Sequence, residues 1–201
     1  SLEEIGASPG MEGEDSVTDD QTVHLVTNAS NDKLTQQLVE QLAQAAAENW
    51  ADSGLTDEQV EVLGSVIYQI ADLSGNQLGV AEGNTITIDY DAVGAGWFID
   101  RTPLMDEEFV LESDGRMIAD VNTAARDRFD LLSIIRHEQG HVLGLVDQYE
   151  QDASSVMYGL IGQGERKVIG VGAAEGSEAL SLEGQHHASA VRVGNCLLYT
   201  S

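Results

Sequence analysis

Two histidines stand four positions apart, at His137 and His141, and Glu138 directly follows the first. On a helix, residues four apart lie one turn apart on the same face, which lets two imidazoles bind one metal ion. Gly144 then allows a sharp turn, so that Asp147 can return towards the same ion. These residues therefore supply two nitrogen ligands, an oxygen ligand and a carboxylate for proton transfer.

This set of side chains fits a hydrolytic zinc site. Catalytic zinc sites commonly use three protein ligands and leave one position to water, whose pKa the ion lowers from about 15.7 to roughly 7. His137, His141 and Asp147 fit the ligand roles, and Glu138 fits the base that takes a proton from this water and passes it to the leaving amine. Imidazole ligands favour Zn²⁺ over Ca²⁺ or Mg²⁺.

Residues 137–147 resemble the extended zinc motif of the metzincin metalloproteases, H-E-x-x-H-x-x-G-x-x-H/D. Met157 lies ten residues beyond Asp147, in a segment similar to the Met-turn that underlies the metal site in this clan. The pattern is matrixin- or serralysin-like. Three upstream segments resemble metzincin-like domains of large bacterial surface proteins: residues 70–73, 85–89 and 96–98. The resemblance covers about residues 21–167.

The resemblance implies an α+β fold, in which a twisted mixed β-sheet is backed by two long helices and the second helix carries the zinc motif. It implies structural roles at the site for Gly144 and Met157, and it makes residues 78–80 the edge strand that pairs with an extended peptide. Two positions depart from the family pattern. Asp147 stands where most members have His, and Gln139 replaces an apolar residue; an anionic ligand makes zinc a weaker Lewis acid.

The helix that must carry the motif has clear signals at both ends. Asp130 can cap its start, apolar residues surround the histidine pair, and Gly144 ends it. A second long helix is predicted from a cap at Asn31 or Asp32 to the vicinity of Gly54.

Strands are predicted where β-branched residues gather. These segments are residues 22–27, 66–71 and 85–89. A helix over residues 57–71, starting at the capped turn of Thr56, also keeps helical apolar spacing and is the alternative for the second strand. Residues 91–118 are expected to be irregular.

The chain is strongly acidic, with 35 Asp and Glu against nine Lys and Arg and a formal net charge of −26. A field of this sign repels nucleic acid and anionic membrane surfaces, which argues against both as partners. It favours oxygen-ligated Ca²⁺, so the composition allows structural Ca²⁺ beside zinc, although no EF-hand spacing occurs. No apolar run approaches the ~20 residues that cross a membrane.

Composition and the resemblances together divide the chain into four regions. Residues 1–20 are acidic and rich in Gly and Ser, which predicts a flexible leader or linker. The resemblance implies a metalloprotease domain over residues 21–167, and the Gly- and Ala-rich composition of residues 168–195 predicts a loose tail. Residues 196–201 resemble a translated transposon mosaic-end adapter used in DNA library preparation, so we expect them to be foreign to the native chain.

Cys196 is the one cysteine, so no internal disulfide forms. Because the chain begins at Ser1 without Met or a signal segment, we expect it to have lost a leader or to belong to a longer multidomain chain. Secreted or cell-surface proteins are the expected setting.

Three functions compete. The leading hypothesis is a zinc-dependent endopeptidase that cleaves peptide or protein substrates with a water activated by Glu138. The alternative is a catalytically weak, metal-stabilised module of a large acidic surface adhesin, which the acidic composition and Asp147 favour. Another metal-dependent hydrolase, such as an amidase, would share the metal site and differ only in its substrate.

Overall fold

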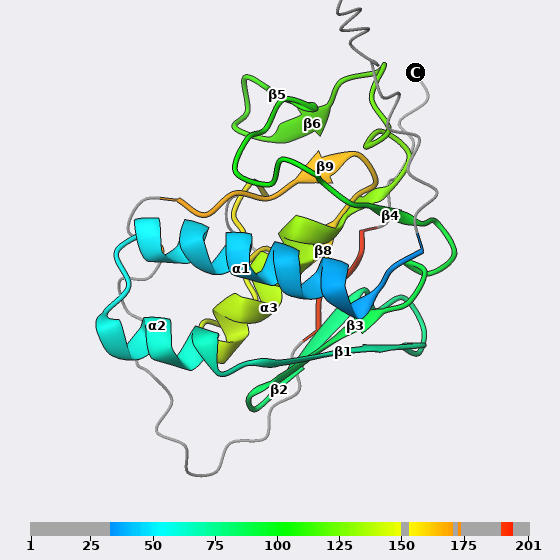
Figure 1. The fold of residues 1–201 in the computed structure, drawn as a ribbon. Helices are drawn as coiled ribbons and strands as arrows, with labels where there is room; N and C mark the ends of the chain where they lie inside the picture. The colour runs from blue at the N-terminus through cyan, green and yellow to red at the C-terminus, as the bar shows by residue number, and fades with distance from the viewer. Residues whose placement is uncertain (1–32, 150–152, 171–172, 174–189, 195–201) are drawn as a thin grey trace, which may run out of the picture.

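The computed structural model describes residues 33–149, 153–170, 173 and 190–194. Within these ranges the chain forms three helices and several small β-sheets, which confirms the predicted α+β class (Figure 1). The predicted strand at 22–27 and the regions 1–20 and 196–201 lie outside the described residues.

The first helix, α1 (Gln36–Asp52), is the long helix that the sequence predicts. It begins at Thr35, whose side chain accepts the Leu38 N–H at 3.3 Å. The prediction of a cap at Asn31 or Asp32 is therefore wrong, since Thr35 supplies the side-chain oxygen directly before the first turn. Residues at helical spacing form its buried face: Val39, Leu42, Ala43, Ala46 and Trp50.

Residues 57–71 combine both predicted alternatives. Helix α2 (Asp57–Gly64) starts with a capping box between Thr56 and Gln59, and strand β1 (Ile67–Ala71) follows it. The strand prediction is confirmed, and the alternative of one continuous helix is wrong beyond Gly64. Val66, Ile67 and Ile70 follow the end of the helix at Ser65, and β-branched residues such as these favour a strand over a helix.

The main sheet is mixed and has the order β1-β3-β2. The central strand, β3 (Thr85–Asp89), confirms the predicted strand and pairs parallel to β1 and antiparallel to β2 (Gly79–Glu82). Strand β2 therefore lies at the edge of this sheet, on the side that faces the third helix.

Helix α3 (Leu131–Val142) carries the histidine pair and is buried along its whole length. Asp130 caps it as predicted, accepting the Ser133 N–H, and Leu143 closes it just before Gly144. The helix contacts α1 on one side and β2 on the other. A helix enclosed in this way holds its side chains rigidly, because every face packs against other elements.

Short strands complete the fold. Residues 91–118, expected to be irregular, contain β4 (Trp97–Phe98), β5 (Phe109–Leu111) and the start of β6 (Met117–Ala119). The expectation of an irregular segment is therefore wrong at these strands: β4 pairs with β7 (Phe129–Asp130), β5 and β6 form a hairpin, and β6 also pairs with β9 (Glu165–Arg166).

The tail region 168–195 contains an ordered contact. Strand β10 (Arg192–Val193) pairs in parallel with β8 (Leu160–Ile161), so residues 190–194 lie against the domain. In Figure 1 this red segment descends behind α1, past β8 towards the main sheet.

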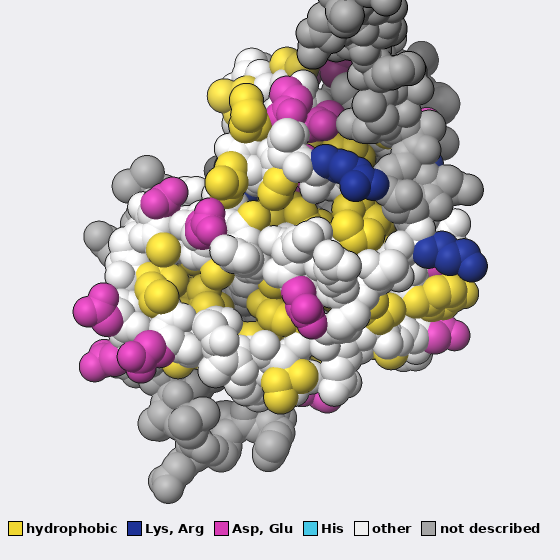
Figure 2. All heavy atoms as spheres, in the orientation of Figure 1, with side chains coloured by type: hydrophobic (Ala, Val, Ile, Leu, Met, Phe, Trp, Pro, Cys, Tyr) yellow, Lys and Arg dark blue, Asp and Glu magenta, His cyan; other side chains and the backbone are white. Residues whose placement is uncertain are grey.

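Acidic side chains are spread over the face seen in Figure 2, with apolar patches between them. No helix in the described part of the chain is long and apolar enough to span a membrane.

Candidate metal centre

Helix α3 and the loop after it bring the three predicted ligands together. His137 Nε2 lies 2.9 Å from His141 Nε2 and 3.0 Å from Asp147 Oδ1, and His141 Nε2 lies 3.3 Å from the same oxygen. Both histidines are buried, whereas Asp147 is partly exposed. These three residues, here named the ligand cluster, form a group that could hold a metal ion.

Backbone carbonyls fix both imidazole rings. His137 Nδ1 lies 2.8 Å from the Val156 oxygen, and His141 Nδ1 lies 2.9 Å from the Leu145 oxygen. A carbonyl only accepts hydrogen bonds, so each Nδ1 carries a proton and each neutral ring presents a lone pair at Nε2. Two lone pairs and a carboxylate oxygen then face one another, and a cation between them removes their repulsion.

The pKa shifts of His141 and Asp147 also favour a positive charge within the ligand cluster. Burial raises the pKa of Asp147, but hydrogen bonds to His137 and His141 outweigh it and hold that pKa well below its usual range. Burial lowers the pKa of His141, but the hydrogen bond to Asp147 and the charge of Glu138 raise it above its ordinary value. Because each Nδ1 already carries a proton, a hydrogen bond from Nε2 to Asp147 requires a charged imidazole, and a bound cation would supply the same positive charge.

The turn after α3 returns Asp147 to the histidines. Gly144 has a φ of 90°, in the left-handed region that favours glycine, and its N–H donates to the His141 carbonyl. The Tyr149 hydroxyl donates to Asp147 Oδ2 at 3.2 Å, which leaves Oδ1 directed at the imidazoles. Tyr149 therefore helps to orient the carboxylate.

Glu138 lies beside the ligand cluster and is completely buried. Its Oε1 accepts the Val191 N–H at 3.1 Å, and its Oε2 has no hydrogen-bond partner among the described residues. Burial raises the pKa of Glu138 above its ordinary value, against the opposing charges of His137 and His141. A carboxylate with a raised pKa and an unpaired oxygen is suited to accept a proton and return it.

Strand β2 approaches Glu138 closely because Gly79 has no side chain. A Cβ at Gly79 would lie 2.8 Å from Ile134 Cγ2, 3.0 Å from Glu138 Cγ and 3.1 Å from Glu138 Oε1. The glycine therefore sets the distance between the edge of the main sheet and the candidate base.

Met157 supports α3 from the side of the ligand cluster. Its turn is closed by the Tyr158 N–H, which donates to the Ser155 carbonyl at 3.1 Å. The Met157 side chain packs against Gly140, where an added Cβ would collide with Sδ, and beside Trp50. Gly140 thus allows the turn to pack directly under the helix segment between Glu138 and His141.

Arg166, which the sequence analysis did not single out, anchors the start of α3. Its buried guanidinium bonds Asp130, the helix cap, at 2.8 and 3.0 Å and Asp100 at 2.7 Å. It also stacks on the Phe109 ring, 4.2 Å from the centroid. The chain separates Arg166 from Asp130 by 36 positions, so no local pattern reveals the pair.

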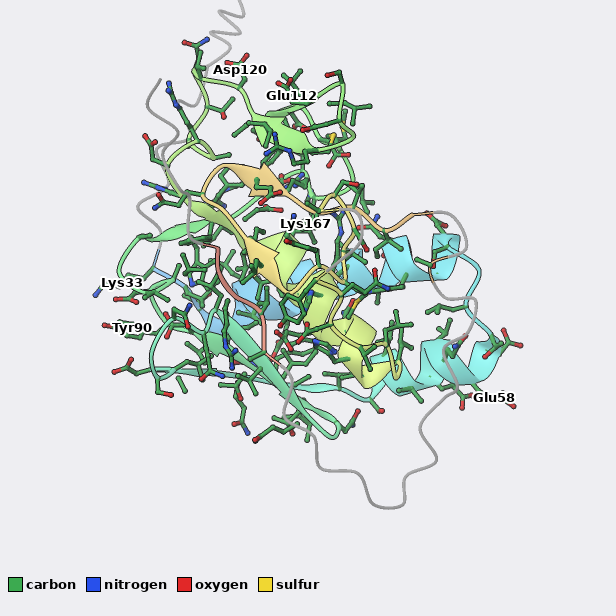
Figure 3. All side chains as sticks on the ribbon, turned by 180° about the vertical axis from the view of Figure 1, so that it is seen from behind. Lys33, Glu58, Tyr90, Glu112, Asp120 and Lys167 are labelled. Atoms are coloured by element: carbon green, nitrogen blue, oxygen red, sulfur yellow. The ribbon has the colours of Figure 1, made fainter. Side chains whose placement is uncertain are left out.

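Other side chains near the motif have structural contacts. Gln139 is buried and its Nε2 donates to the Ala43 carbonyl of α1 and to the Tyr68 hydroxyl, both at 2.9 Å. Lys167, near the centre of Figure 3, stands 5.3 Å from the Tyr158 ring. Gln139 therefore connects α3 to α1 and β1.

Comparisons with known proteins give no match: no family model, no curated protein and no solved structure corresponds to this chain.

Proposed function

We propose that this chain is a zinc-dependent endopeptidase of the metzincin type, with a matrixin- or serralysin-like catalytic domain. The observation that carries the proposal is the ligand cluster beside a buried, partly unpaired Glu138. Two imidazoles, one carboxylate and an adjacent second carboxylate match the residues that zinc hydrolases use. The anchored turn at Met157 and the edge strand β2 add support from the surroundings of the site.

Zinc fits the donor set. Nitrogen ligands suit Zn²⁺ better than Ca²⁺ or Mg²⁺, which prefer oxygen alone. A tetrahedral zinc with ligand bonds of about 2.0–2.1 Å separates its ligand atoms by roughly 3.3 Å. The ligand atoms of the cluster are 2.9 to 3.3 Å apart, so small side-chain shifts accommodate the ion. Bound zinc would polarise the substrate carbonyl and acidify water at this position.

Glu138, Tyr149 and β2 would have the remaining roles at the site. Glu138 would take a proton from water and return it to the nitrogen of the breaking peptide bond. Burial serves this task, because it raises the pKa of Glu138 and makes the acid form accessible nearer neutral pH. Tyr149 would hold Asp147 in its ligand orientation, and β2 would pair with the backbone of the peptide.

The decisive experiment replaces Glu138 by Gln, which keeps the size and removes the proton-accepting charge. We expect Glu138→Gln to lower kcat on fluorogenic peptides by at least about 10²-fold, as loss of a general base does. Zinc content should stay at the wild-type level, because Glu138 is outside the ligand cluster. Glu58→Gln is the matched control, since Glu58 is exposed at the far end of α2 (Figure 3).

Retention of hydrolysis in Glu138→Gln would refute the proposed mechanism. A zinc-loaded wild-type protein that cleaves no peptide in a broad library would instead favour the second candidate, a metal-stabilised module of an acidic surface adhesin. The anionic ligand Asp147 is the observation that favours this candidate, because it weakens zinc as a Lewis acid.

A further inference from the structure

Residues 190–194, here named the covering segment, lie directly against the candidate catalytic site. The Val191 N–H donates to Glu138 Oε1 at 3.1 Å, and this contact joins residues 53 positions apart. In the rear view of Figure 3 the segment runs between β8 and the main sheet. The peptide group between Ala190 and Val191 is therefore within reach of the proposed general base.

The covering segment is held as an added strand on its two sides. On the first side it runs antiparallel to residues 76–78, which lead into β2: Leu78 N–H donates to the Val191 carbonyl at 3.0 Å, and Val193 N–H donates to the Asn76 carbonyl at 3.1 Å. These bonds involve main-chain atoms alone, so they depend on the extended shape of the segment and not on its side chains.

On the second side the covering segment runs parallel to β8. Arg192 N–H donates to the Gly159 carbonyl at 3.2 Å, and Gly194 N–H donates to the Ile161 carbonyl at 2.9 Å. The N–H groups of residues 191–194 thus all have acceptors in the domain. Two of these acceptors, the carbonyls of Gly159 and Ile161, come just after the Met157 turn.

From Val191 to Val193 the side chains of the covering segment alternate as in a strand, and Ala190 is buried as well. Val191 is 2 % exposed and belongs to the hydrophobic core that includes Ile161, whereas Arg192 is exposed. Val191, whose N–H donates to Glu138, therefore lies in apolar surroundings that accept a branched aliphatic side chain.

We propose that the space between residues 76–78 and β8 is a groove for an extended peptide with a small aliphatic residue, and that the covering segment fills it in cis. The proposal rests on the proposed function, because it makes the segment a competitor of substrate at the site of Glu138. While the Val191 N–H is bonded to Glu138 Oε1, a peptide substrate cannot bring its own scissile nitrogen to that oxygen. A segment on the same chain competes at an effective concentration that reaches about millimolar.

The first test uses the wild-type chain without zinc and measures hydrogen exchange of individual amides. We expect slow exchange at residues 191–194, and faster exchange there when a peptide of the sequence of residues 188–194 is added at several millimolar. The amides of α3 should stay protected throughout. Fast exchange at residues 191–194 without peptide, or protection that the peptide does not change, would overturn the proposal.

The second test compares Arg192→Pro with Arg192→Ala. Proline removes the N–H that bonds Gly159, whereas alanine removes only an exposed side chain and keeps the backbone bond. We expect the fluorescein-labelled peptide of residues 188–194 to bind metal-free Arg192→Pro at least about tenfold more tightly than wild type or Arg192→Ala. A labelled peptide with Asp at the position of Val191 should bind none of them.

Equal binding by Arg192→Pro and Arg192→Ala, with α3 protected in both, would contradict the groove. Neither test measures hydrolysis. A chain that binds the peptide and cleaves nothing therefore refutes the proposed function and keeps this inference, whereas a chain that cleaves peptides without displacement of the covering segment refutes this inference alone.

Discussion

Replacement of Arg166 by Met is the perturbation whose size follows most directly from the structure. The Arg166 side chain is 0 % exposed, and its partners Asp100 and Asp130 are 0 % and 1 % exposed. Burial lowers the pKa of Arg166, but the charges and hydrogen bonds of Asp130 and Asp100 raise it above its ordinary value, so it stays charged. Methionine keeps much of the volume and leaves both carboxylates buried without their cation.

Loss of one partner from a buried ion pair costs about 3–5 kcal/mol, because the remaining charge stays desolvated. A domain has about 5–15 kcal/mol of stability in total, so Arg166→Met should remove a large part of it. Because Asp130 caps α3, the loosened end of the helix should also weaken metal binding at His137.

Urea denaturation followed by tryptophan fluorescence measures this effect, since Trp50 and Trp97 are both buried. Arg166→Lys, which keeps the charge and loses the bidentate contact, should lie between wild type and Arg166→Met. Arg116→Met is the matched control, because the Arg116–Asp114 pair is exposed and such pairs contribute little. A cost below about 1 kcal/mol for Arg166→Met would refute the role given to the buried network.

Three further predictions concern the site. Asp147→Asn should weaken zinc binding at least about tenfold in a chelator competition, whereas Asp114→Asn, an exposed residue outside the ligand cluster, should not change it; equal affinities would exclude Asp147 as a ligand. Gly140→Ala should lower the thermal midpoint despite the helix propensity of alanine, because its Cβ collides with Met157, whereas Gly64→Ala, with nothing within 4 Å of its Cβ, should not. In EDTA, the free energy of unfolding should fall as the pH rises above about 6.5, because the raised pKa of His141 contributes stability that is fully present below the unfolded-state value and is lost as the pH rises through the folded-state pKa. With zinc bound the trend should reverse, since zinc requires the neutral imidazole; a rise in EDTA would contradict the assigned pKa shift.

Local signals in the sequence identify the elements that hold the site. The Asp130 cap, the apolar residues of α3 and Gly144 place the start and the end of the motif helix within a residue. The prediction worked because caps and turn glycines act over three or four residues, the range over which a sequence pattern is read.

Such local patterns do not reveal contacts between segments that are distant in the sequence. Val191 lies in a region expected to be a loose tail, yet its backbone N–H reaches Glu138. No local pattern distinguishes Arg166 from an exposed charged residue, because its burial depends on Asp130 and Asp100, which lie 36 and 66 positions away in the chain. Backbone pairing and buried charge networks depend on the tertiary fold, so residue type alone does not reveal them.

X-ray absorption at the zinc edge tests the central claim most directly, because it counts the ligands of the bound ion. The proposed site predicts one zinc per chain with two imidazole nitrogens and carboxylate oxygen at about 2.0–2.2 Å. In His141→Gln the imidazole count should fall to one. Zinc content far below one per chain, or an imidazole count that His141→Gln leaves unchanged, would contradict a metal centre at His137, His141 and Asp147.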